Sequence, residues 1–351
     1  MNGRASHPSA PGGYAVSKAS AARRLVTAAA YGGGGLGVLG GALYGLVKVE
    51  AMLARRTIGP AKDAPPPVAD GVYGAYLPGE AVSLLLLGDS AAAGYGMTDA
   101  LDTPGALMGQ GLAGIVGRPV RITCRAFVGA RTASLDRQIT DGLRSAPVLA
   151  VIIIGANDVT HSVRPSEAVR LLARAVRRLH TNGCEVVVGT CPDLGTIGPI
   201  APPLRQLARV WSHRMAAAQT ITTVEAGGRS VSLGQLLGQE FAAAPHELFG
   251  ADRFHPSRAG YARMVAALLP SVADALGVRT VDDEWLDSMA GEGVLPVSFA
   301  AAQAADVAGT EVTATSVAGS DRGPRGRWAQ IRRRRRAEVP QPSAPTADIP
   351  R

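Results

Sequence analysis

Short apolar runs alternate with longer segments of helical periodicity along the middle of this 351-residue chain, and this alternation restricts the fold more than any other feature. The runs of strand length span residues 82–87, 120–127, 148–154, 185–189 and 219–224. The helical segments span residues 104–116, 134–143, 165–180, 204–218 and 256–269, the last with Pro256 in its first turn. Strands that are apolar on both faces and separated by helices predict a parallel sheet with helices on both sides. We therefore expect an α/β sandwich domain over residues 80–277.

Polar and glycine-rich segments follow three of the predicted strands, and a fourth such segment precedes the last helix. These segments are Gly88-Asp89-Ser90, Gly129 to Thr132, Gly155-Ala156-Asn157-Asp158 and Asp252-Arg253-Phe254-His255. In an open parallel sheet, functional groups gather at the carboxyl ends of the strands. We therefore expect the four segments to meet at one edge of the sheet.

Acyl transfer needs a nucleophile, a base, a group that orients the base and hydrogen-bond donors for the oxyanion, and each has a candidate here. Ser90 is the candidate nucleophile, because it follows a buried strand in a turn of small residues. His255 is the candidate base, and Asp252 can reach its Nδ1 atom and so leave Nε2 as the proton acceptor. The backbone N–H groups of Ser90 and Gly129 and the side-chain amide of Asn157 would form the oxyanion hole.

Each segment taken alone also has an ordinary structural explanation as a turn, a helix N-cap or a surface ion pair. Their joint occurrence, in this order, favours a catalytic site. The arrangement resembles the SGNH (GDSL-type) hydrolase family, and the resemblance covers roughly residues 80–270. It implies a flavodoxin-like three-layer α/β/α sandwich with a central parallel sheet, and hydrolysis of esters without a metal or an organic cofactor.

The resemblance also implies a role for each candidate residue. It makes Ser90 the nucleophile, Asp252 and His255 the rest of the triad, and Gly129 and Asn157 oxyanion-hole residues. The GxSxG turn of the α/β-hydrolases is absent from the sequence, which argues against that other serine-esterase fold.

The remaining chemistry-bearing side chains give weaker signals. His161 follows the Asn157 segment by four residues and is a candidate substrate contact at the mouth of the cleft. The three cysteines, Cys124, Cys184 and Cys191, are too few for a disulfide framework and form no zinc-binding pattern. We expect them to be structural thiols, and we expect no metal and no cofactor.

The first 79 residues predict a membrane anchor and a spacer. Residues 1–24 have the composition of a mobile basic arm. Residues 25–47 carry no charge, and at about 1.5 Å per residue a helix of this length spans a hydrocarbon core of about 30 Å. They predict one transmembrane helix, a signal anchor. Residues 48–79 are rich in proline and predict a stiff, extended spacer.

A cleaved signal peptide is the alternative to this anchor, although the apolar run is longer than the roughly 7–15 residues of a signal-peptide core. Basic residues flank the run on both sides, so the positive-inside rule gives little direction. An outward-facing, extracytoplasmic domain is our expectation from the signal-anchor layout. Four glycines recur at every fourth residue of this run: Gly33, Gly37, Gly41 and Gly45. Either they form one face through which the helix self-associates, or their spacing is accidental.

Charge is distributed unevenly along the chain, whose net charge is +8. Residues 1–24 carry +4 and residues 321–351 carry +6, so the rest of the chain is slightly negative. A near-neutral middle argues against a nucleic-acid enzyme. Residues 278–320 predict an extension of uncertain order, and residues 321–351 a disordered Arg-rich tail that is either simply solvated or attracts anionic lipid or nucleic acid.

Three functions remain open on the sequence. The first is a serine esterase or lipase-like hydrolase acting on short- to medium-chain esters. The second is an O-acyltransferase that uses the same triad on a glycan or glycolipid acceptor. The third is a non-enzymatic, membrane-tethered interaction module. The four segments favour an enzyme, because a scaffold does not need all of these residues together.

Overall fold

The computed structural model describes residues 65–234, 239–278, 293–307, 309–315, 322–323 and 326–333. The predicted arm, the predicted transmembrane helix with its four spaced glycines, and the spacer before residue 65 lie outside the described residues. Within the ranges described, no helix combines the length and the apolar character needed to cross a bilayer.

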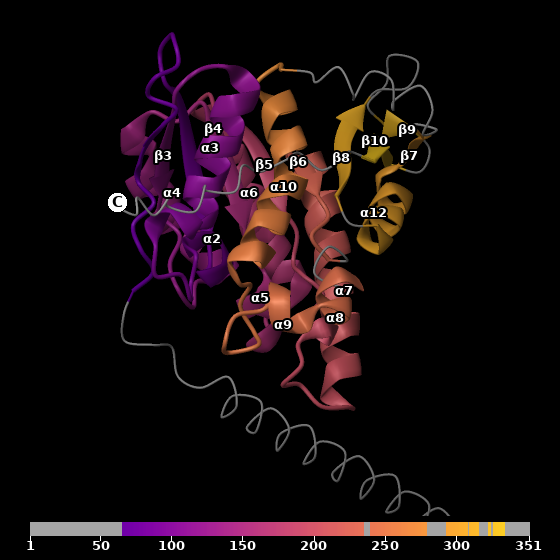
Figure 1. Cartoon of the computed structure of the whole chain (residues 1–351). Coiled ribbons are helices and arrows are strands. Elements are labelled where there is room, and N and C mark those ends of the chain that lie inside the picture. Colours follow the sequence, from indigo (N-terminus) through magenta and orange to yellow (C-terminus); the bar gives the residue numbers. More distant parts are fainter. Residues whose placement is uncertain are drawn as a thin grey trace, which may run out of the picture. The chain divides into compact units, whose positions relative to one another are not determined.

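Five parallel strands form the centre of the sheet, in the spatial order β3-β2-β4-β5-β6 (Figure 1). They are β2 (Val82–Gly88), β3 (Val120–Cys124), β4 (Leu149–Ile153), β5 (Glu185–Gly189) and β6 (Arg229–Val231). The first four confirm predicted strands. The carboxyl ends of β2, β3 and β4 therefore lie at one edge, as the sequence predicted.

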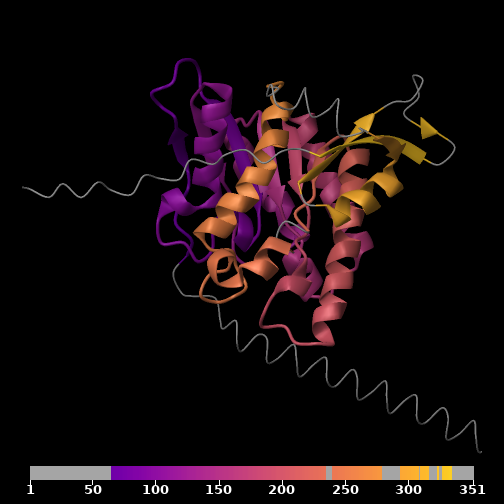
Figure 2. The same cartoon turned by 45° about the vertical axis from the view of Figure 1, so that its right-hand side comes forward.

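Helices cover both faces of these strands, which gives the predicted three layers (Figures 1 and 2). Alternate residues of β2 enter two separate cores: Leu84 and Leu86 pack with one face, Leu85 and Leu87 with the other. The first core is closed by α3 (Pro104–Val116) and α10 (Arg258–Ala275), the second by α4 (Leu135–Gly142) and α6 (Pro165–Thr181). This two-sided burial explains why β2 contains four consecutive leucines.

Shorter elements connect these layers or carry the site. The remaining helices are α2 (Ser90–Ala93), α5 (Ala156–Thr160), α7 (Leu204–Glu225), α8 (Gln239–Ala243), α9 (Pro245–Leu248) and α12 (Val297–Asp306). The 3-10 turns are η1 (Ala100–Asp102), η2 (Thr132–Ser134), η3 (Leu143–Ser145) and η4 (Leu194–Thr196).

The predicted central parallel sheet is confirmed, but antiparallel strands extend it on both sides, so the whole sheet is mixed. At one edge β1 (Gly71–Tyr73) pairs antiparallel with β3, so part of the predicted spacer is a strand. At the other edge β8 (Thr310–Thr315) pairs antiparallel with β6, and β10 (Gly326–Arg333) lies between β8 and β7 (Gly293–Pro296). A two-residue strand, β9 (Arg322–Gly323), pairs with β10.

Strand β10 falls inside the tail predicted to be disordered, so that prediction is wrong for residues 326–333. Apolar and polar residues alternate in this segment, as in a strand, although its arginine content is high. Ala329 and Ile331 point to one face and pack against α12 and Val312, whereas Arg332 lies 3.7 Å from the carboxylate of Asp274. The apolar face and the ion pair hold the strand in the sheet.

Several boundaries also differ from the sequence prediction. Residues 219–224 continue helix α7 and are not a strand, and β6 begins later, at Arg229. Helix α10 begins after Pro256, because the Ser257 hydroxyl accepts the N–H of Gly260 and caps it, while Pro256 forms a β-bridge with Phe249.

Candidate active site

The turn that carries Ser90 requires glycine at its start. Gly88 ends β2 with φ at 142°, and a Cβ there would collide with the carbonyl oxygen of Ile153 on β4. The buried Gln138 side chain holds Gly88 by accepting its N–H at 2.9 Å and donating to its carbonyl oxygen at 2.8 Å. Asp89 then caps α2, so that Ser90 is the first residue of a short helix.

Asp252 and His255 lie in a loop that is closed at its base. The bridge between Phe249 and Pro256 joins its two ends, and the N–H of Gly250 donates to the carbonyl oxygen of His255 at 2.8 Å. Inside the loop, the Oδ1 atom of Asp252 accepts the backbone N–H of His255 at 3.0 Å. The carboxylate is therefore turned toward the imidazole by its own local backbone.

The three predicted triad residues form one continuous hydrogen-bonded chain. The Nδ1 atom of His255 lies 2.7 Å from Oδ2 of Asp252, and its Nε2 atom lies 2.9 Å from Oγ of Ser90. The rings of Tyr95 and Phe254 pack on the imidazole at centroid distances of 4.4 and 4.7 Å. An ionised carboxylate at Nδ1 favours the tautomer in which Nε2 accepts a proton.

The Asp252 carboxyl is held in its charged form. Partial burial by itself would raise its pKa, but the hydrogen bonds from the His255 side chain and from the backbone of Phe254 and His255 outweigh burial. The pKa of Asp252 is therefore lower than usual, and the group is ionised at neutral pH.

The loops that carry Gly129 and Asn157 are tied to each other. Gly129 has a φ of 80°, which favours glycine. The Nδ2 atom of Asn157 donates to the carbonyl oxygen of Ala130 at 3.0 Å. The buried Asp158 carboxylate accepts the N–H of Thr132 at 3.1 and 3.2 Å and its hydroxyl at 2.9 Å. These bonds fix the distance between the two segments that the sequence assigned to the oxyanion hole.

Asp89, Gln138 and Asp158 hold the turns of the site in place through hydrogen bonds to backbone groups. None of the three was predicted from the sequence to do so. Burial raises the pKa of Asp89 to about 7, although its carboxyl accepts the N–H groups of Ala91 and Gly155. Asp89 and Asp158 belong to the polar segments that follow β2 and β4, and their place in these segments was the only sequence feature that could have indicated a role in the site. Gln138 lies 50 residues from Gly88 and offers no local sequence signal.

His161 and Cys191 lie near the site, but no hydrogen bond joins either side chain to the described triad residues. His161 is exposed, and its Nδ1 atom lies 2.8 Å from the carbonyl oxygen of Asn157. Cys191 is buried and free, and burial raises its pKa well above the usual value. Within the part of the chain that the structure describes, no group of three His, Cys, Asp or Glu side chains could hold a metal ion.

Residues 86–263 match the model of the GDSL-like Lipase/Acylhydrolase family. The chain belongs to this family. A GDSL-like esterase of Mycobacterium tuberculosis is 42% identical over 265 residues, which cover 72% of this chain and 83% of that protein. The family match confirms the resemblance predicted from the four segments. The chain is an SGNH-type serine hydrolase, so the hypothesis of a purely non-enzymatic module is wrong.

Solved structures of other esterases are more distant from this member of the GDSL-like family. An acetylxylan esterase from Geobacillus stearothermophilus is 18% identical, with 57% of this chain and 98% of that chain covered and a TM-score of 0.44. The psychrotrophic esterase EstA from Pseudoalteromonas is 16% identical, with 59% and 99% covered and a TM-score of 0.42.

Proposed function

We propose that the chain is a serine esterase that cleaves short- to medium-chain carboxylic esters through an acyl-enzyme on Ser90. The observation that carries the proposal is the chain of hydrogen bonds from Asp252 through His255 to the Ser90 hydroxyl. Membership of the GDSL-like family supports it.

In the proposed mechanism, Ser90 Oγ attacks the ester carbonyl carbon as its proton passes to Nε2 of His255. The alcohol leaves with that proton when the bond between the acyl carbon and the alcohol oxygen breaks. Water then attacks the acyl-enzyme, gives a proton to His255, and the acid is released as Ser90 Oγ is reprotonated. Asp252 stabilises the imidazolium at both stages.

The oxyanion that forms in each step would lie among the N–H groups of Ser90 and Gly129 and the side-chain amide of Asn157. An asparagine amide has two N–H groups, and one of them is occupied by the carbonyl oxygen of Ala130. That bond orients the amide and leaves the second N–H for the oxyanion. His161 is the proposed additional substrate contact, since it lies on the turn that follows Asn157.

Hydrolysis of chromogenic esters with acyl chains from two to about twelve carbons tests the proposal. The full-length protein should hydrolyse part of this series, and Ser90→Ala should lower kcat by about 10³-fold or more while circular dichroism stays unchanged. Ser145→Ala, at a serine whose hydroxyl donates to the carbonyl oxygen of Gly142 at the end of α4, is the matched control and should retain activity. Activity of Ser90→Ala within a few-fold of wild type would overturn the proposal.

An O-acyltransferase is the alternative with the same triad. In that case a hydroxyl group of a glycan or glycolipid, instead of water, would attack the acyl-enzyme. Mass spectrometry of the products after addition of sugar acceptors distinguishes the two reactions, because only a transferase moves the acyl group to the sugar.

We also propose that residues 25–47 anchor the enzyme in a membrane, with the catalytic domain on the extracytoplasmic side. The support is the uncharged run of 23 residues and the basic residues that flank it. Carbonate extraction of membranes followed by protease protection tests this arrangement. Release by carbonate would contradict the anchor, and full protection in right-side-out vesicles would contradict the orientation.

A further inference from the structure

Two hollows of very different size lie on opposite sides of the Ser90 turn. One is lined by Ser90 and His255 themselves and lies toward β4, β5 and α10. The other lies toward β3 and β1, where Ala93 and Tyr95 form its inner wall. We call them the acyl pocket and the alcohol groove, for reasons that follow.

The acyl pocket is small, enclosed and apolar. Its volume is about 50 Å³, and its walls include Leu194, Ile197, Phe249 and Phe254. This volume is a third of that of an apolar cavity of about 150 Å³ that binds benzene, so the pocket takes only a group smaller than a benzene ring. An acyl chain of two to four carbons fills it.

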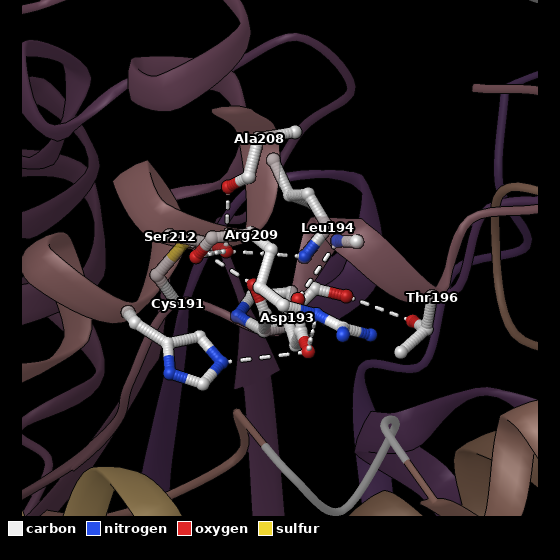
Figure 3. Close-up of polar contacts among 10 residues, drawn as sticks. Cys191, Asp193, Leu194, Thr196, Ala208, Arg209 and Ser212 are labelled. Carbon is white, nitrogen blue, oxygen red and sulfur yellow. Dashed lines mark hydrogen bonds and ion pairs between the residues drawn. The ribbon is translucent and has the colours of Figure 1, made fainter. Parts of the chain in front are cut away.

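Polar contacts join Asp193 and Leu194, on the wall of the acyl pocket, to Arg209 and Ser212 of helix α7 (Figure 3). The Asp193 carboxylate accepts the N–H of Gly195 at 2.8 Å and lies 3.2 Å from Nε of Arg209. The Ser212 hydroxyl accepts the N–H of Leu194 at 3.2 Å. Because η4 is bound to α7 through the carboxylate of its N-cap residue Asp193 and through the backbone of Leu194, the wall resists the displacement that a longer chain would require.

The alcohol groove is larger and more open. Its volume is about 450 Å³, three times that of an apolar cavity of about 150 Å³ that binds benzene. The segment Pro65–Asp70 forms one wall, and Phe127 and Val128, directly before Gly129, form another. The groove lies beside the catalytic centre, because its wall residue Tyr95 packs on the imidazole of His255.

The order of product release decides which hollow receives which part of an ester. The alcohol must leave before water can attack the acyl-enzyme, whereas the acyl group stays bonded to Ser90. An alcohol in the enclosed pocket would have to pass the acyl-enzyme to escape. An alcohol in the open groove would not have to pass the acyl-enzyme.

Resting on the proposed esterase function, we infer that the substrate is an ester of a short acyl group, two to four carbons long, with a bulky and largely apolar alcohol. The acyl group enters the pocket bounded by η4, and the alcohol lies in the groove formed with Pro65–Asp70. Ile197 is the residue that limits acyl length, and Phe127 is the residue that selects the alcohol.

The acyl half of the inference is tested with nitrophenyl esters that share one alcohol and differ only in acyl length. Wild-type kcat/KM should fall at least tenfold from butanoate to octanoate, since a single surplus methylene already costs about tenfold or more in a closed pocket. Ile197→Ala should raise the octanoate-to-acetate ratio at least fivefold. Ile200→Ala is the matched control, because Ile200 is buried in the same apolar cluster but does not line the pocket.

The alcohol half is tested with acetate esters of two alcohols of similar acidity, ethanol and 2-cyclohexylethanol, by titration of the acid released. Wild type should favour the bulky ester, and Phe127→Ala should lower that preference at least fivefold. Phe299→Ala is the control, because Phe299 is another exposed phenylalanine on the distant helix α12.

The outcomes separate this inference from the function on which it rests. Ser90-dependent hydrolysis that is fastest for octanoate or dodecanoate, or that prefers ethyl acetate, would overturn the inference and leave the esterase intact. An absence of Ser90-dependent hydrolysis across both ester series would overturn the esterase and the inference together.

Discussion

The Nε2 atom of His255 lies 2.9 Å from the Oγ atom of Ser90, although 165 residues separate the two in the chain. Two rigid local structures produce this contact. The Gly88 turn places Ser90 at the end of β2, and the loop between Phe249 and Pro256 presents the imidazole from the side of α10. The site is therefore assembled by the packing of α10 against the parallel sheet.

Replacement of Asp252 by Asn should lower kcat by about 10³-fold or more, because a neutral amide cannot stabilise the imidazolium and also permits the wrong His255 tautomer. Steady-state kinetics on a chromogenic acetate ester measure this effect. Asp141→Asn removes another carboxylate, one that makes only 4.0 Å ion pairs at the surface, and should leave kcat unchanged. A loss of less than tenfold at Asp252 would contradict its assigned role.

Replacement of Asn157 by Ala should lower kcat by about 10²–10³-fold with little change in KM, since the oxyanion develops only in the transition state. The comparison variant is Asn182→Ala, at an exposed asparagine that bonds to a carbonyl oxygen at the end of α6. If Asn157→Ala raised KM and left kcat unchanged, the amide would bind the ground state and not the oxyanion.

Two glycine-to-alanine substitutions should have opposite effects on stability. Gly88→Ala should lower the free energy of unfolding by about 3 kcal/mol or more, because Gly88 has a φ of 142° and a Cβ there would collide with Ile153. Gly114→Ala should instead raise the free energy of unfolding by about 0.5–1 kcal/mol, because position 114 lies within helix α3 and a Cβ there meets no other atom. Urea unfolding measures both. A tolerated Gly88→Ala would show that the Ser90 turn is less constrained than the close contact with β4 implies.

Stability should depend on pH through Asp89. The pKa of its carboxyl rises from 3.8 to about 7 on folding, so between these values the folded state holds a proton that the unfolded state has lost. The folded state is therefore favoured by this group at low pH, and its advantage is lost as the pH rises to about 7. Asp89→Asn cannot titrate, so its Tm relative to wild type should rise from pH 5 to pH 8. A constant difference would contradict the raised pKa.

The C-terminal strands should contribute to stability through a buried ion cluster. Glu311, on β8, is fully buried, accepts the Ser271 hydroxyl at 2.7 Å and pairs with Arg229 at 2.9 Å. Glu311→Ala should destabilise the fold by about 3 kcal/mol, because it removes one of the two carboxylates that pair with the largely buried Arg229 guanidinium and leaves the Ser271 hydroxyl without its acceptor. Glu311→Gln keeps an acceptor and should cost less. Equal stabilities in urea unfolding would show that β8 docks without this cluster.

The sequence predicted the parallel centre of the fold and the residues that meet at its edge. The apolar runs of β2 to β5 are unambiguous because they are buried on both faces, and glycines that require a positive φ mark the turns that follow them. The hydrogen-bonded arrangement of Ser90, Asp252 and His255 could be expected because a nucleophile, a base and a carboxylate have fixed mutual requirements.

Long-range polar contacts account for what the sequence did not predict. Residues 219–224 have the β-branched composition of a strand, but Gln219 bridges the ends of β4 and β5 by bonds to Ile154 and Cys191, which a helix can position. Strand β10 was missed because arginine content outweighed the alternation of Ala329 and Ile331. In both cases the partner lies far along the chain, and a local pattern carries no information about it.

Labelling with a fluorophosphonate, which reacts irreversibly with an activated serine, tests whether Ser90 is the nucleophile. One adduct per chain is expected, located by peptide mass spectrometry on the peptide that contains Ser90, and esterase activity should fall in proportion to labelling. The His255→Ala variant should label far more slowly, because Ser90 then lacks its base. An adduct on a different serine, or esterase activity that survives complete labelling of Ser90, would contradict the account.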